Sequence, residues 1–385
     1  MKRASVLCMI LALACAACSP ALAYNGNEYT AYAEQQFRTS RVKNGMVLVS
    51  LNGERVATFT WGRRTEQGGT VTADTCFRVA SVTKFVTAVG LMTYYDRGAF
   101  GLDDDIRTVL PMMPITNPAF PDVPITPRHI LSHTSSFSGD ANYTTPAWEK
   151  ITRPENKYYT RRHAPGTHYE YSNMNGAVFG SMVEALSGLS VNSALRETVF
   201  EPLGINAAYH PYLLPDQSNV ADTFAWDDHM QVLYMAEVRR FENYSDTCDP
   251  RGNCGNSVGR MYISGSGLER LLITLMNGGT YDGVQILRPE TVAQMEAEQE
   301  TLPGSSVTGT SRYGLGMEHV HGLPGGVWYG HQGRVGSLTC DAYYQKDTGL
   351  TVVVIATGYR YGVHDSMVTL AVRLMQEAEK FVTDP

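Results

Sequence analysis

A serine and a lysine stand three residues apart within the stretch 77–84, where a short apolar segment runs into a region of helical periodicity. Apolar residues recur at helical spacing after Ser81, and Asp96-Arg97-Gly98 supplies a stop signal. Because residues three apart share a helix face, the Lys84 amine can reach the Ser81 hydroxyl. A desolvated lysine can act as a base, and a helix N-terminus offers backbone N–H groups to a developing oxyanion. The spacing therefore predicts a nucleophilic serine.

A structural role is the alternative interpretation of Ser81, since serine is a good helix N-cap. A capping box would place Glu or Gln three residues later, whereas this chain carries Lys84. A second copy of the spacing, Ser40-Arg41-Val42-Lys43, lies near the end of an earlier predicted helix. The Ser-x-x-Lys spacing alone therefore does not identify a site, and the hypothesis requires partners elsewhere in the chain.

Two further motifs each occur once in the chain. Tyr171-Ser172-Asn173 opens a predicted helix, where a phenol near a lysine can shuttle protons and an amide can hold a substrate carbonyl. His331-Gln332-Gly333 lies on a predicted strand, where glycine lets a substrate approach the strand edge. Arg334 follows, and its fixed charge suits a carboxylate. A packed tyrosine at a helix start and an exposed strand histidine are the structural alternatives for the two motifs.

The first 23 residues have the pattern of a secretory signal, with Lys2-Arg3, an apolar run and the cleavage site Ala21-Leu22-Ala23. Cys18 would also allow a lipid-modified cysteine after cleavage, although Cys15 stands where such sites usually carry leucine. No later segment is apolar enough to predict a transmembrane span. We therefore expect an exported protein, located in the periplasm, in the cell envelope or outside the cell.

Charge and cysteine content further limit the function. Without residues 1–23, 29 basic and 38 acidic residues remain, and this net charge of −9 argues against nucleic-acid binding. Four cysteines also remain, a number that an exported chain can pair into two disulfides. Cys248 and Cys254 bracket a short loop with Pro and Gly and are predicted to pair, which leaves Cys76 with Cys340. Two buried free thiols are the alternative for the second pair.

Predicted strands gather at the two ends of the chain and predicted helices in its middle. The expected elements are a helix over 27–40, strands over 45–50, 54–61 and 75–80, helices over 82–95, 173–186 and 268–276, strands over 327–335, 337–345 and 350–357, and a closing helix over 363–382. This order favours an α/β fold of the α+β type, in which an antiparallel sheet is flanked by the N- and C-terminal helices. We expect one domain over 24–385, with a sheet region (about 24–84 and 260–385) and an inserted, mainly α-helical region (about 85–259). The cleft between the two regions is the expected active site.

Taken together, the motifs resemble those of a known family. Ser81-Val82-Thr83-Lys84, Tyr171-Ser172-Asn173 and His331-Gln332-Gly333 stand in the order found in the penicillin-recognising serine hydrolases. The chain resembles in particular the branch that contains class C β-lactamases, D-alanyl-D-alanine carboxypeptidases, D-aminopeptidases and esterases. The resemblance extends over about residues 45–358 and implies a β-lactamase/transpeptidase-like fold.

The resemblance also implies a role for each matched residue. These roles are the acylated nucleophile for Ser81, activation and proton transfer for Lys84 and Tyr171, contact with the substrate amide for Asn173, and lining of the pocket for His331 and Gly333. The backbone N–H groups of Ser81 and Arg334 would form the oxyanion hole. The resemblance implies neither a metal nor a cofactor.

The third motif departs from class C β-lactamases, which usually carry Lys-Thr-Gly there. His331 is more similar to the peptidase and esterase relatives, and Gln332 replaces a hydroxyl residue that usually contacts the substrate carboxylate. We therefore expect a peptidase for small D-amino-acid peptides of cell-wall type, such as a D-Ala-D-Ala carboxypeptidase, with Arg334 on the carboxylate. A hydrolase for esters or a class C-like β-lactamase is the alternative. A catalytically silent member that binds a peptide or a partner protein is the alternative outside the enzymes.

Overall fold

The computed structural model describes residues 24–138, 158–225, 246–252, 255–299, 311–364 and 367–383. The predicted leader with Cys18 lies outside these residues, and so does Cys254. Among the described residues, no helix is both long and apolar enough to cross a bilayer. The strands are β1 (Asn44–Leu51), β2 (Glu54–Thr65), β3 (Gly68–Thr70), β4 (Cys76–Arg78), β5 (Ala207–Ala208), β6 (Tyr262–Ser264), β7 (Thr280–Tyr281), β8 (Val284–Gln285), β9 (Ser311–Tyr313), β10 (Glu318–Val320), β11 (Trp328–Val335), β12 (Leu338–Gln345), β13 (Leu350–Thr357), β14 (Val363–His364) and β15 (Met367–Val368). The helices are α1 (Gly26–Ser40), α2 (Val82–Asp96), α3 (Ile106–Val109), α4 (Pro127–Leu131), α6 (Asn173–Ser187), α7 (Val191–Leu195), η1 (Arg196–Phe200), η2 (Pro211–Leu213), α9 (Asn256–Gly259), α10 (Gly265–Met276), α11 (Pro289–Glu296), α12 (Thr369–Ala378) and α13 (Lys380–Thr383).

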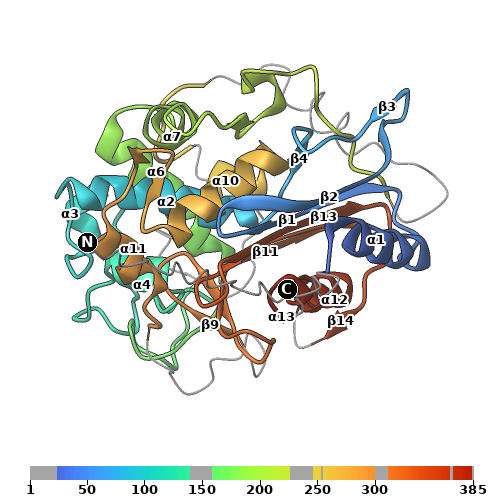
Figure 1. Ribbon diagram of the computed structural model, residues 1–385. Coiled ribbons are helices and arrows are strands. Elements are labelled where there is room, and N and C mark those ends of the chain that lie inside the picture. Colours follow the sequence, from blue (N-terminus) through green and yellow to red (C-terminus); the bar gives the residue numbers. More distant parts are fainter. Residues whose placement is uncertain are drawn as a thin grey trace, which may run out of the picture.

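One antiparallel sheet joins the two ends of the chain (Figure 1). Its strands follow the order β3-β2-β1-β13-β12-β11-β10-β9, so that the first long strand lies beside the last. In this pair Asn44 is opposite Thr357 and Leu51 is opposite Leu350. The β1–β2 hairpin turns at Asn52-Gly53, and both residues have the positive φ that an Asn-Gly turn favours. The prediction of an antiparallel sheet built from both chain ends is confirmed.

Different helices cover the two faces of this sheet, because side chains alternate along each strand. In β13, Val352 and Val354 belong to the core cluster that includes α1 and α12, whereas Val353 and Ile355 belong to the cluster that includes α2, α6 and α10. Figure 1 shows α1 and α12 on one side of the sheet and α10 and α2 on the other. All residues of α2 from 82 to 94 are buried, so this helix forms the centre of the larger core.

A small sheet of order β4-β6-β5 brings the chain to the start of α2. Cys76 is opposite Ser264 and Arg78 is opposite Tyr262 in its β4–β6 ladder. The Val79 N–H then donates to the Met261 carbonyl at 3.1 Å, which continues this pairing beyond β4. The turn that precedes α2 is therefore anchored on the strand that leads into α10.

The closing helix predicted over 363–382 is shorter in the structure. β14 and β15 pair antiparallel, with Val363 opposite Val368. The Thr369 N–H donates to the Gly362 carbonyl at 3.0 Å, which closes a hairpin, and α12 begins only at Thr369. The hydrophobic periodicity was therefore correct for α12 but extended too far toward the N-terminus.

The predicted disulfide between Cys76 and Cys340 is wrong, because both are buried free thiols on different sheets. Cys76 accepts a hydrogen bond from Asn206 Nδ2 at 3.2 Å, and burial raises the pKa of its thiol to about 12. Burial also raises the pKa of Cys340 well above its ordinary value. Cys248 is likewise a free thiol, and Cys254 lies outside the described residues, so neither predicted bridge is present in the described structure.

Candidate active site

Ser81 lies at the turn between β4 and α2, directly after a residue with a strained backbone. Ala80 has a φ of 45°, in the left-handed region that residues other than glycine rarely adopt. Ser81 is the N-cap of α2, but its side chain makes no capping hydrogen bond. In the described part of the chain, no acceptor pairs with its backbone N–H either. Both the hydroxyl and this N–H are therefore available to a substrate.

Lys84 is fully buried one helical turn beyond Ser81. Its Nζ donates to Ser81 Oγ at 3.0 Å and to the Val258 carbonyl, just before the end of α9, at 2.7 Å. Gly176 in α6 provides the space for this side chain, since a Cβ there would lie 2.7 Å from Lys84 Cε. The close approach of α2, α6 and α9 thus aims the amine at the serine hydroxyl.

Tyr171 and Asn173 lie at the start of α6. The Lys84 Nζ lies 5.4 Å from the centroid of the Tyr171 ring. Ser172 caps α6 by accepting from the Met174 N–H, and Asn173 is the first helical residue, half-buried. The structure therefore brings together Ser81 and Lys84 from the first motif and Tyr171 from the second.

His331 on β11 faces the same region, with its ring centroid 6.3 Å from that of Tyr171. Its Nδ1–H donates to the Gln332 carbonyl at 2.5 Å, because a carbonyl oxygen can only accept. Nε2 therefore accepts from the Tyr313 hydroxyl at 2.9 Å. Burial, together with the charge of Lys84, lowers the pKa of His331 to about 3. The imidazole is consequently neutral at pH 7 and adds no positive charge to the site.

Gly333 lets β11 pack directly against the turn that carries Ser81. A Cβ on Gly333 would lie 2.2 Å from the Val79 carbonyl oxygen and 3.0 Å from the Ser81 nitrogen. Any side chain at this position would therefore separate the strand from the nucleophile. The glycine of the third motif thus sets the distance between β11 and α2.

Gln332 and Arg334 belong to the opposite face of β11. Register places Gln332 opposite Asp341, and its Nε2 donates to the buried Glu318 carboxylate at 2.8 Å. Arg334 is exposed near the end of the strand. Burial raises the pKa of Glu318 and of Asp341, and the positive charge of Arg334 opposes part of this rise. The structure therefore does not bring the Gln332 side chain to Ser81, although His331 and Gly333 lie on the face that does approach it.

Sequence reasoning assigned no function to three residues that shape this site, namely Ala80, His133 and Gly176. The His133 ring stacks on Tyr171 with ring centroids 4.4 Å apart and planes inclined by 21°. Gly176 left a signal in the sequence, because glycine inside a helix costs about 1 kcal/mol and needs a reason. The left-handed Ala80 and the long-range contact of His133 left no such signal.

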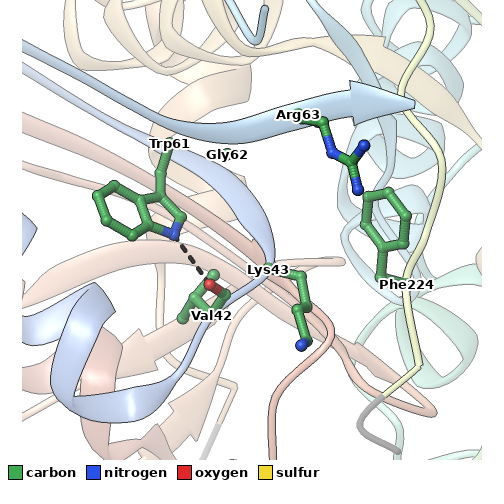
Figure 2. Close-up of a pocket in the computed structure, with 6 residues that line it drawn as sticks. All are labelled: Val42, Lys43, Trp61, Gly62, Arg63 and Phe224. Atoms are coloured by element: carbon green, nitrogen blue, oxygen red, sulfur yellow. Dashed lines mark hydrogen bonds between the residues drawn. The ribbon is translucent and has the colours of Figure 1, made fainter. Parts of the chain in front are cut away.

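The second Ser-x-x-Lys copy forms no comparable contact in the described residues. Ser40 ends α1, and Arg41, with a φ of 60°, turns the chain before Lys43. Lys43 is exposed and lines a separate pocket of about 430 Å³ (Figure 2). Figure 2 shows it between Trp61 and Phe224, which form opposite walls. Lys43 therefore does not activate Ser40.

A serine hydroxyl in contact with a buried lysine, at a helix start and beside a tyrosine, is the arrangement of a serine hydrolase. Among the described residues, no group of three or more His, Cys, Asp or Glu side chains could hold a metal ion. The chain belongs to the Beta-lactamase family, whose family model matches residues 31–374.

Named relatives agree with this family. Penicillin-binding protein 4 of Amycolatopsis lactamdurans is 26% identical over 297 residues, which cover 76% of this chain and 74% of the relative. The D-alanyl-D-alanine-carboxypeptidase/endopeptidase AmpH of Escherichia coli strain K12 is 29% identical over 198 residues, 48% of this chain and 50% of the relative. The octameric penicillin-binding protein homologue from Pyrococcus abyssi has the same fold, with a TM-score of 0.73, 20% identity and coverage of 92% of this chain and 79% of that one. The chain is therefore a serine hydrolase of the β-lactamase and penicillin-binding protein family.

Proposed function

We propose that this protein is an exported D-amino-acid peptidase of the D-Ala-D-Ala carboxypeptidase type, which acts through an acyl-enzyme on Ser81. The observation that carries the proposal is the 3.0 Å contact between Ser81 Oγ and the Nζ of the fully buried Lys84. The choice of substrate is supported by the name of the AmpH relative, and His331 in place of the usual lysine favours a peptidase or an esterase over a class C β-lactamase. Export is supported by the leader pattern of residues 1–23.

Acylation starts when Lys84, in its amine form, takes the Ser81 proton while Oγ attacks the carbonyl carbon of the substrate. The backbone N–H groups of Ser81 and Arg334 stabilise the negative charge that develops on the carbonyl oxygen. The C–N bond then breaks, and the leaving amine receives the proton from Lys84 through the Tyr171 hydroxyl. Water then attacks the ester carbonyl and gives one proton to the same pair. The bond between the acyl carbon and Oγ breaks, the pair returns the proton to Ser81 Oγ, and the acid leaves.

Asn173, His331 and Gly333 hold the substrate in this scheme. The Asn173 amide binds the substrate amide next to the scissile bond, and the neutral His331 lines the pocket beside it. Gly333 keeps β11 close to Ser81, so that the extended substrate can lie along the strand edge. The Gln332 side chain does not contact the substrate in this scheme, because its amide donates to the Glu318 carboxylate.

Arg334 is the residue that we assign to the C-terminal carboxylate of the substrate. Its side chain starts on the face of β11 opposite Ser81, but it is exposed near the strand end, beyond the part of β11 that pairs with β10, so it can bend around this edge toward the substrate. Guanidinium binds a carboxylate through two parallel hydrogen bonds. Replacement by Ala should raise the KM for a D-Ala-D-Ala peptide about tenfold, which corresponds to about 1.4 kcal/mol. The KM for the same peptide with an amidated C-terminus should not change. Equal losses for both peptides would refute the assignment.

Covalent labelling tests the nucleophile. The mature protein is treated with a fluorophosphonate and with fluorescent penicillin, and the adducts are located by mass spectrometry. We expect both adducts on Ser81, no labelling of Ser81→Ala, and normal labelling of the matched variant Ser40→Ala. An adduct on Ser40, or no adduct with either probe, would refute the acyl-enzyme, and the second result would favour a silent binding protein.

Ester hydrolysis is the second candidate function, and the neutral His331 is the observation that favours it. With no charge on this imidazole, the third motif attracts a substrate carboxylate less than the usual lysine would. A panel of p-nitrophenyl esters and D-Ala-D-Ala peptides separates the two functions by their kcat/KM values. Faster turnover of uncharged esters than of every D-peptide would replace the peptidase assignment with an esterase.

A further inference from the structure

One histidine contacts Tyr171 and both of its neighbours in the chain. The His133 carbonyl accepts from the Glu170 N–H at 2.9 Å, and its Nδ1 accepts from the Ser172 N–H at 3.1 Å. Between these two bonds, the imidazole stacks on the Tyr171 ring, with centroids 4.4 Å apart. Backbone and ring of the tyrosine are thus held by a single residue from a segment that lies 38 positions earlier in the chain.

His133 is itself held rigidly. It is only 1% exposed, and its φ of 58° is in the left-handed region. Asn175 Nδ2 lies 3.1 Å from Nδ1, while Asn175 Oδ1 accepts from Ser135 Oγ at 2.6 Å. Tyr313 packs edge-on against the imidazole, with the two ring centroids 4.8 Å apart. A strained backbone persists only where its surroundings fix it, and strained residues cluster at functional sites.

The bonds of His133 also define its chemical form. Both groups around Nδ1 are N–H donors, so Nδ1 must carry the lone pair and Nε2 the proton. Burial and the nearby Lys84 charge hold the pKa of His133 well below its ordinary value. The ring is therefore neutral against Tyr171 at neutral pH, and it places no second positive charge beside Lys84.

We propose that His133 is a positioning residue that fixes the Tyr171 ring, so that its hydroxyl stays between Ser81, Lys84 and the leaving group. This inference rests on the proton-transfer role of Tyr171 in the proposed function. His133 touches neither the substrate nor the reacting atoms. Because a misplacement of about 1 Å can slow a reaction about 100-fold, loss of the stack should slow acylation strongly.

Two variants separate the two contacts. His133→Phe keeps a ring on Tyr171 but removes the acceptor for the Ser172 N–H. His133→Asn keeps an acceptor and tolerates the left-handed backbone, but removes the ring. His129→Asn is the matched control, because His129 also accepts a backbone N–H on Nδ1, from Thr126 at 3.3 Å, as part of the cap of α4. Urea unfolding of each variant establishes that it is folded.

The decisive measurement is the acylation rate constant with fluorescent penicillin in a double-mutant cycle with Tyr171→Phe. We expect His133→Asn to slow acylation about 100-fold alone and less than threefold in the Tyr171→Phe background, with His133→Phe in between and His129→Asn unchanged. A positioning role also predicts a shift in the pH profile of acylation for His133→Asn. If His133→Asn slows acylation equally in both backgrounds, its role is purely structural and the inference is wrong. If Tyr171→Phe alone leaves acylation unchanged, the proposed role of Tyr171 fails first.

Discussion

The end of α1 and the start of α2 contain the same Ser-x-x-Lys spacing with opposite outcomes. At the start of α2, Lys84 is buried and its Nζ contacts the Ser81 hydroxyl at 3.0 Å. At the end of α1, Lys43 is exposed and has no contact with Ser40 in the described residues. The same residue types at the same distance in sequence therefore give a candidate catalytic pair in one place and a pocket wall in the other.

The position of one left-handed residue explains the difference. Ala80, with a φ of 45°, precedes the first motif, so Ser81 and Lys84 share a continuous helical turn. Arg41, with a φ of 60°, lies inside the second copy and ends the helix before Lys43, after which β1 begins at Asn44. Residues three apart face each other only while the helix continues between them. The spacing is thus informative only together with the place where the helix begins.

Removal of each lysine is the test with the largest expected effect. Lys84→Ala should slow acylation of Ser81 by about 10³-fold, since general-base catalysis contributes about 10²–10⁴-fold. Lys43→Ala should stay within twofold of the unchanged protein. Stopped-flow acylation with fluorescent penicillin measures both rates. A similar loss in the two variants would remove the distinction between the copies.

Gly176 and Gly180, one turn apart in α6, give a test of intermediate size. A Cβ at Gly176 would lie 2.7 Å from Lys84 Cε, and one at Gly180 would lie 2.6 Å from Ser257 Oγ. Substitution of either glycine by Ala should destabilise the protein by about 1 kcal/mol, because crowding outweighs the gain in helix propensity. Only Gly176→Ala brings its methyl group against Lys84 itself, and it should slow acylation about 10–100-fold.

Rates and urea midpoints of both glycine variants distinguish loss of geometry from loss of stability. Equal acylation rates for Gly176→Ala and Gly180→Ala would show that the position of Lys84 tolerates the extra methyl group. The difference between the Ser81–Lys84 pair and the Ser40–Lys43 pair would then depend only on the burial of the lysine.

The smallest expected effect concerns the two left-handed residues themselves. Arg41→Gly should raise the free energy of unfolding by about 0.5–1 kcal/mol, because glycine adopts this backbone without strain and is favoured after a helix. Ala80→Gly should gain less, since its methyl group is buried and would be lost. Urea unfolding at pH 7 measures both changes. A larger gain for Ala80→Gly would mean that more strain is stored before Ser81 than after Ser40.

Local physics made much of the fold predictable. The Asn52-Gly53 turn and the alternation of its flanking strands predicted the β1–β2 hairpin, and helical spacing with the stop signal at Asp96-Arg97-Gly98 predicted α2 to within one residue of its end. The closing helix was predicted too long, because periodicity does not reveal where Val363 finds a strand partner. The error over Cys76 and Cys340 has the same origin, since parity of cysteines says nothing about which sheet each one joins.

The site was less predictable wherever a contact spans distant segments. The order of the motifs brought Ser81, Lys84 and Tyr171 together, but the left-handed φ of Ala80 and the contact of His133 with Tyr171 depend on tertiary structure. Gln332 is different, because strand alternation alone places it on the face opposite His331. What the sequence did not reveal was its partner, the buried Glu318 on a neighbouring strand.

The adjacency of β1 and β13 has a consequence for the order of assembly. A nascent chain that ends at residue 259 already holds Ser81, Lys84 and Tyr171, yet it lacks the strands β9–β13 that close the sheet and place Gly333 against the nucleophile. Asn44 in β1 can pair only after Thr357 in β13 has been synthesised, and pairing between residues so far apart in the sequence slows folding. The site around Ser81 therefore stays incomplete until the last long strand has emerged and paired with the first.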